Sequence, residues 1–361
     1  MSAPPSTLTA KPVVLVTGAS GKIGSAVVRQ LCKAGYPVRA LVRTKDARSK
    51  ALESLGAVVV VGDLTDADSM AEACRGSKRA LYVPPISAFA LQGAVALAAG
   101  ARAAGVEHIV GISQWLGSRR SPSLQSRQHA AIDELFFSLK AHGISHTCVM
   151  PGFFADLPYL IFMKFAALQG LFPFPADPDA KDAPPSVEDI ARVATHCLMY
   201  PERHGGKTYR PTGPELLSVR QMVEVMGRVL KKKVTLVPLP LFMVHKAMLS
   251  EGFDEFTTAQ MGIYLDELSA GAFAYSAPTT DVLDVTGSPA ETFEATATRH
   301  AAMPRNTRSV GNILGAWADF MVLPFRRGLN VAAYNRRQAT PPPFKPALAM
   351  DNEAWKTAHK R

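Results

Sequence analysis

The chain has 361 residues, a length that suits one large α/β domain or two smaller ones. With 47% hydrophobic and 19% charged residues it can bury a core; no apolar run approaches a membrane span of roughly 18 residues, and four well-separated cysteines argue for a reduced, cytoplasmic protein without a metal site. The net charge is +10, but most of the excess lies at 299–361, which is typical of a solvated basic tail and argues against a nucleic-acid partner.

Short β-branched runs alternate with helical patterns over the first half of the chain. We expect residues 1–11 to form a flexible tail. The order of the segments that follow is typical of a Rossmann-type, doubly wound parallel sheet, which we assign to residues 12–155 as a nucleotide-binding domain. The predicted strands are 13–17, 38–42, 58–61, 79–83, 108–113 and 147–150, and later helices are predicted near 46–55, 66–75, 87–104 and 126–142.

The regular alternation of strand and helix patterns ends after the sixth predicted strand. We expect residues 156–302 to form a smaller α/β substrate lobe that closes over the carboxyl edge of the sheet, and 303–361 to form a basic C-terminal extension. One amphipathic helix is expected at 313–323. Its apolar face could dock on the chain itself, form a homodimer or lie on an anionic membrane, and its shortness favours the first two. Helix-capping signals stand at Ser186, Ser218 and Ser288.

A glycine-rich turn connects the first predicted strand to the first helix. It reads TGASGKIG over residues 17–24. Gly18 allows a tight turn, Gly21 lets the backbone approach a pyrophosphate, and Gly24 lets the helix pack on the strand. The N–H groups at the start of the helix then face the negative charge. The turn therefore predicts a dinucleotide site built from Gly18, Ser20, Gly21, Lys22, Ile23 and Gly24.

The end of the second predicted strand carries a basic side chain where NAD enzymes usually place an acid. A guanidinium at Arg43 can hold a 2′-phosphate, so NADP is favoured over NAD. Alternatively, Arg43, Lys45 and Arg48 form a solvated basic loop. After the third strand, Asp63 and Leu64 could contact the adenine, or Asp63 could form an Asx turn, and both readings stay open.

These motifs resemble the NmrA-like family of the atypical short-chain dehydrogenase/reductase superfamily. The resemblance extends over about residues 12–302, and the last 60 or so residues depart from it. It implies a Rossmann fold and NADP(H) as the cofactor. The matching pieces are VTGASGKIG at 16–24, ALVR at 40–43, GDLTD at 62–66, LYVPP at 81–85, GIS at 111–113, GISHTCVMPGFFAD at 143–156, SVEDIARVA at 186–194, KTYRPTGPE at 207–215 and TTDVLDVTGSPAETF at 279–293.

The resemblance also implies where catalytic groups would lie. Short-chain dehydrogenases use a serine after strand five, which Ser113 matches, and a Tyr-x-x-x-Lys pair, whose positions Gln125 and His129 occupy. Glutamine has no titratable proton. His129 could bind the nicotinamide ribose and donate the proton, or it could be a surface histidine. Asp133 and Glu134, one turn further on, could orient it, or they could be solvated acids of an exposed helix face. Pro84 is expected beside the nicotinamide.

The aromatic residues after the sixth strand have two interpretations. Most are expected in the core of the lobe, while Phe153, Phe154 and Tyr159 are candidates for an apolar substrate pocket. We therefore expect an NADPH-dependent oxidoreductase that transfers a hydride to a small apolar carbonyl, enone or quinone, whose anion could take a proton from water. The alternative is a non-catalytic NADP(H)-sensing regulatory protein that binds a protein partner, which the missing tyrosine favours.

Overall fold

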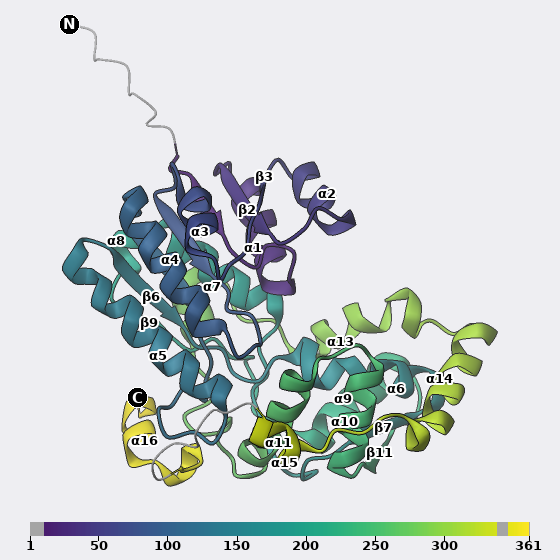
Figure 1. Cartoon of the computed structure of the whole chain (residues 1–361). Helices are drawn as coiled ribbons and strands as arrows, with labels where there is room; N and C mark the ends of the chain where they lie inside the picture. Colours follow the sequence, from purple (N-terminus) through teal and green to yellow (C-terminus); the bar gives the residue numbers. More distant parts are fainter. Residues whose placement is uncertain (1–10, 338–345, 361) are drawn as a thin grey trace, which may run out of the picture.

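A seven-stranded parallel sheet forms the centre of the N-terminal part of the molecule (Figure 1). The structure, a computed structural model, describes residues 11–337 and 346–360; the predicted tail at 1–11 lies outside this range except for its last residue. The strand order is β3-β2-β1-β4-β5-β6-β9. The strands are β1 Val14–Val16, β2 Val38–Val42, β3 Val58–Val61, β4 Arg79–Tyr82, β5 His108–Ile112, β6 Ser145–Val149 and β9 Thr208–Tyr209.

Helices cover both faces of this sheet, as a doubly wound fold requires. One face carries α1 and α7, whose apolar sides share a core with β1 and β2; the other carries α3, α4 and α5. The strand order reverses between β1 and β4, so their carboxyl ends open a crevice where such folds bind ligands. The helices of this part are α1 Lys22–Lys33, α2 Ala47–Ser54, α3 Ala67–Cys74, α4 Ala90–Ala104, α5 Leu124–Ser138, α7 Val187–Met199, α8 Pro201–His204 and α12 Asp281–Thr286.

The Rossmann unit extends beyond its predicted range of 12–155. Strand β9 pairs with β6, and α7 covers the face beside α1, although both lie in the range predicted for the substrate lobe. Helix α12 packs on α7 in turn. A strand of two residues has no detectable periodicity, so the return of the chain to the sheet at β9 was not predictable from the sequence.

The second lobe is mainly helical and has an aromatic core. Phe162, Phe165, Phe172 and Phe174 are buried there. Caps at Ser186 and Ser218 are confirmed, but the predicted start at Ser288 is wrong because Thr292 caps the helix instead. The lobe contains α6 Met163–Gln169, β7 Leu171–Phe174, β8 Lys181–Asp182, β10 Leu217–Ser218, α9 Val219–Leu230, β11 Thr235–Pro238, α10 Leu241–Ser250, α11 Glu255–Ser269 and α13 Phe293–Ala301.

The C-terminal extension runs along the lobe and back toward the Rossmann unit. Helix α14 (Val310–Val322) packs on α6, α15 (Val331–Arg337) packs on α11, and α16 (Glu353–His359) ends the yellow path in Figure 1. Ala316 of α14 is buried against α6, as docking on the chain itself predicts, whereas Trp317 is 43% exposed. A homodimer through this exposed face remains a prediction. Within the described ranges, no helix is both long and apolar enough to cross a membrane.

Candidate active site

The glycine turn, residues 17–24, has the backbone geometry of an anion-binding loop. Gly18 has φ +59°, and a Cβ on Gly24 would lie 2.2 Å from the Gly18 carbonyl oxygen, so only glycine allows this approach. Helix α1 starts after Gly21 without a side-chain cap, and its first turn carries no acidic residue. Its first N–H groups are therefore not capped by a side chain, and the helix dipole favours an anion at this end.

The basic residues after β2 differ in their partners. Arg48 is bound by the Asp46 carboxylate at 2.6 Å, and Lys45 lies 3.8 Å from Glu53. Arg43 is exposed at the strand end and forms no salt bridge within the described ranges. Acidic neighbours thus pair with Lys45 and Arg48. Arg43 is the basic side chain of this loop without a salt bridge in the described residues.

The loop after β3 forms the expected Asx turn. The Asp63 carboxylate accepts hydrogen bonds from the backbone N–H and the hydroxyl of Thr65, both at 2.8 Å. These bonds, with a smaller effect of Arg43 nearby, lower the pKa of Asp63. Leu64 packs on the core beside α4. A contact of either residue with adenine stays a proposal.

A cavity of about 310 Å³ opens at the carboxyl edge of the sheet, between the Rossmann unit and the lobe. The glycine turn, the ends of β4, β5 and β6, and helices α5 and α11 all contribute to its wall, which is mainly apolar. It brings together these predicted site residues: Gly21, Lys22, Ile23, Pro84, Ser113, His129, Phe153 and Phe154. Gly18, Ser20, Gly24, Arg43, Asp63 and Leu64 do not line it.

Three buried polar atoms on the cavity wall have no hydrogen-bond partner in the described residues. They are Gln114 Nε2, Gln125 Oε1 and His129 Nδ1. Gln125 Nε2 lies 2.8 Å from His129 Nε2, so the two side chains fix each other and leave the orphaned atoms of this pair for a ligand. Unpaired buried polar atoms are costly, and these three belong to residues that line one cavity.

His129 is not a surface histidine, because only 6% of it is exposed. Burial lowers its pKa to about 4, so the imidazole is neutral at pH 7. A neutral imidazole is a much weaker acid than an imidazolium, which argues against His129 as the proton donor, and this role stays a prediction. A role in binding the ribose remains a proposal.

Asp133 contacts Ser113 rather than His129. The Ser113 hydroxyl donates to Asp133 Oδ2 at 2.6 Å, and both residues are buried. The expectation that Asp133 orients His129 was therefore wrong. The carboxylate follows His129 by one helical turn, but its side chain reaches the end of β5 instead.

Tyr159 lies in the lobe core and does not line the cavity, which corrects its expected place in the substrate pocket. It is fully buried, donates to Asp182 Oδ2 at 3.1 Å and stacks on Phe174 with the ring centroids 5.4 Å apart. Burial, with the Asp182 carboxyl beside it, raises the pKa of the phenol well above its usual range. Only Phe153 and Phe154 of the three predicted pocket residues reach the cavity.

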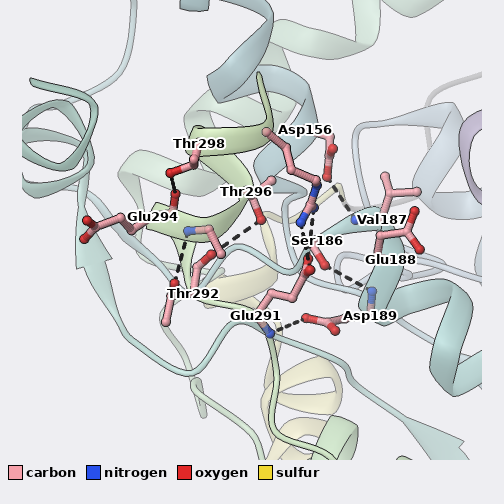
Figure 2. A network of polar contacts seen from close by, with 12 residues as sticks. Asp156, Ser186, Val187, Glu188, Asp189, Glu291, Thr292, Glu294, Thr296 and Thr298 are labelled. Carbon is pink, nitrogen blue, oxygen red and sulfur yellow. Dashed lines mark hydrogen bonds and ion pairs between the residues drawn. The ribbon is translucent and has the colours of Figure 1, made fainter. Parts of the chain in front are cut away.

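A polar network joins the two lobes beside the cavity (Figure 2). The Asp156 carboxylate accepts the Val187 N–H and lies against His300 Nε2, each at 2.9 Å, and Asp189 Oδ2 accepts the Glu291 N–H at 2.7 Å. Lys22 donates to the Asp156 carbonyl at 3.4 Å. The network thus connects α1, α7 and α13 and fixes the cavity wall at Lys22 and Asp156.

Comparison with known proteins identifies the family. The model of the NmrA-like family matches residues 10–285. The chain belongs to the NmrA-like family. An NAD(P)H azoreductase from Xenophilus azovorans is 31% identical over 292 residues, which cover 80% of this chain and 98% of the relative.

Two solved structures share the fold of this NmrA-like protein. The NADPH-dependent quinone oxidoreductase QOR2 of Escherichia coli, complexed with NADPH, has a TM-score of 0.67 at 23% identity, with 79% of this chain and 99% of that chain covered. NmrA, a negative transcriptional regulator, has a TM-score of 0.62 at 18% identity, with 80% and 95% covered. At these identities the likeness concerns the fold alone.

Several residues of the cavity were missed by the sequence reasoning. In this NmrA-like protein α11 supplies Gln260 and Tyr264, and Trp115 and Phe273 also line the cavity. The Tyr264 hydroxyl donates to Gln114 Oε1. The one signal was a glutamine and a tyrosine one helical turn apart among apolar residues, a pattern that also fits an ordinary half-buried helix.

Proposed function

We propose that the protein is an NADPH-dependent reductase of small apolar carbonyl, enone or quinone compounds. The observation that carries the proposal is that the glycine turn, Ser113 and an apolar wall of lobe residues border one cavity. A dinucleotide on the turn would thus reach the space in which an apolar substrate is enclosed. The azoreductase relative supports reductase chemistry.

The residues present fit the cofactor. The uncapped start of α1 would hold the diphosphate, Arg43 the 2′-phosphate, and the orphaned atoms of Gln125 and His129 would meet polar groups of the nicotinamide half. NADPH supplies a hydride when it is bound. The chain binds and orients the two reactants, and the lobe excludes water from the cavity.

Ser113 would hold the reacting oxygen of the substrate. Ser113 follows β5 and lines the cavity. In the same wall the ring of Phe153 stacks on Phe273, with the ring centroids 4.9 Å apart. This flat aromatic pair suits a planar conjugated substrate better than a flexible polar one. The proposal therefore places quinones and enones before simple alcohol-forming ketones.

Turnover measurements test the proposal. NADPH oxidation is followed at 340 nm with 1,4-naphthoquinone, 2-cyclohexenone, an aromatic aldehyde and an azo dye. Met261→Trp, on α11 in the cavity wall, is expected to raise KM for the quinone severalfold without changing NADPH affinity. Met321→Trp is the control, because Met321 is 66% exposed on α14.

The regulatory alternative predicts a different result. It rests on glutamine at the position of the usual tyrosine and on the fold shared with the regulator NmrA. Calorimetric binding of NADPH with no turnover of any of the four compounds would favour it over a reductase. A lack of affinity for both NADPH and NADH would refute both functions.

A further inference from the structure

Ser113 and Asp133 form a buried pair that connects the cavity to the interior of the Rossmann unit. Ser113 lines the cavity at the end of β5, and Asp133 lies behind it on α5, with 4% and 6% of their surfaces exposed. Their oxygens are 2.6 Å apart, a length typical of a hydrogen bond to a charged or strongly polarised group. The reductase proposed above uses Ser113 but does not need this partner.

Within residues 11–337 and 346–360, Asp133 forms no salt bridge that would hold it as a carboxylate. Cys148 on β6 also hydrogen-bonds the carboxyl, and a ring nitrogen of His146 on the same strand lies within 4.8 Å of the carboxyl and thiol atoms. Burial lowers the pKa of His146 to about 3, so this ring is neutral. Glu134, the next residue on α5, forms a salt bridge with Arg119 at 2.6 Å. The charge of Arg210 acts to lower the pKa of the Cys148 thiol, against the larger effect of burial.

The carboxyl therefore titrates close to neutrality. Burial raises the pKa of Asp133 to about 7, although the hydrogen bonds from Ser113 and Cys148 oppose the shift. Glu134 raises it slightly further. Both protonation states are thus populated at physiological pH.

The two states give the hydrogen bond opposite directions. A carboxylate only accepts, so the Ser113 proton points inward to Asp133 and the cavity meets an oxygen lone pair. A carboxylic acid donates its own proton to the Ser113 oxygen, and the Ser113 O–H is then free to donate into the cavity.

We infer that Asp133 is a positioning residue that sets the direction of the Ser113 hydroxyl and replenishes its proton, so that the pair takes the place of the missing tyrosine. This inference rests on the proposed function. With NADPH bound as proposed above to supply the hydride, Ser113 would pass its proton to the substrate oxygen and would take the Asp133 proton in turn. The carboxylate that remains is reprotonated from water.

The first test needs neither cofactor nor substrate. In the unliganded protein labelled with ¹³Cγ-aspartate, one NMR signal, absent in Asp133→Asn, is expected to titrate with a midpoint of about 7. Ser113→Ala removes a bond to the charged form and should raise this midpoint by about one pH unit. Glu134→Gln is the control, because this exposed side chain should move it much less. A midpoint near 4, or one that Ser113→Ala leaves unchanged, overturns the inference.

The second test uses the pH profile of kcat/KM with 1,4-naphthoquinone. The wild type is expected to lose activity as the pH rises through about 7, whereas Asp133→Asn should be flat over this range and Asp133→Glu should restore a pH dependence. Ser113→Ala should lower kcat/KM about 100-fold. The double variant with Asp133→Asn should lower it little further. If Asp133→Asn keeps the pH profile of the wild type, the proposed proton transfer from Asp133 to Ser113 is overturned. The NMR result could hold although no compound is turned over. The proposed function and the proton transfer to the substrate would then fail, while the pH-dependent direction of the Ser113–Asp133 hydrogen bond would stand.

Discussion

The Trp355 indole N–H donates to the backbone carbonyl of Trp115 at 3.1 Å, across 240 positions of the sequence. Trp115 lines the cavity, and Trp355 lies on α16, the last helix. The ring of His359 stacks on Trp355 with the centroids 4.0 Å apart and also contacts the Trp115 carbonyl. The C-terminal extension is thus part of the support of the candidate active site.

Removal of this support should lower stability. Trp355→Ala deletes a side chain that is 3% exposed, so the free energy of unfolding should fall by about 3 kcal/mol. Trp317→Ala, on the exposed face of α14, should cost less than about 1 kcal/mol. Urea unfolding measures both variants, and equal losses would show that α16 does not dock as described.

A charge reversal at the end of β2 should separate the two nicotinamide cofactors. Arg43→Glu places a carboxylate where the 2′-phosphate is proposed to bind, so NADPH affinity should fall at least about 10-fold while NADH affinity changes little. Arg48→Glu is the matched control, because Arg48 is already bound to Asp46. Calorimetry with both nucleotides decides, and equal losses for NADPH and NADH would remove Arg43 from the site.

The glycine turn should reject any side chain at its last position. Gly24→Ala would bring a Cβ to 2.2 Å from the Gly18 carbonyl, so we expect a loss of about 2–3 kcal/mol in unfolding free energy and weaker NADPH binding. Gly315→Ala in α14 meets nothing within 4 Å and should instead stabilise the chain by up to about 1 kcal/mol. Thermal unfolding compares them; a neutral Gly24→Ala would contradict the close packing of α1 on β1.

Glu267 should make stability depend on pH. Its buried carboxyl accepts the Ala349 N–H at 3.0 Å, and burial raises its pKa to about 7, above the value of about 4.3 for an unfolded chain. Between these values the folded state binds more protons than the unfolded state, so this group's contribution to stability falls as pH rises.

Replacement of Glu267 removes this titration but keeps an oxygen for the Ala349 N–H. From pH 5 to pH 8 the unfolding free energy of Glu267→Gln should therefore gain about 2 kcal/mol relative to the wild type. Glu353→Gln, with an 81% exposed side chain, is expected to show no such gain. Denaturant titrations at the two pH values measure the difference, and parallel curves for Glu267→Gln and wild type would refute the assignment.

The local elements of the Rossmann unit were predictable because their signals are local. The apolar runs at β2 and β3 match the predicted ranges, because β-branched residues favour strands both in the buried β2 and in β3, an edge strand whose end residues are exposed. The glycine turn was predictable for the same reason, because a tight turn and a close helix approach restrict the residue type at each position.

The partners of the site residues were decided by the tertiary structure alone. Asp133 stands one helical turn from His129, yet it bonds Ser113, and Tyr159 bonds Asp182 in the lobe core. Periodicity describes one segment at a time, whereas burial, a displaced pKa and a hydrogen-bond partner depend on segments that meet only after folding. The sequence by itself therefore determined the family, six strands of the main sheet and the turn. The arrangement of the folded chain decided which side chains face the cavity and in which protonation state, because both depend on segments that meet only after folding.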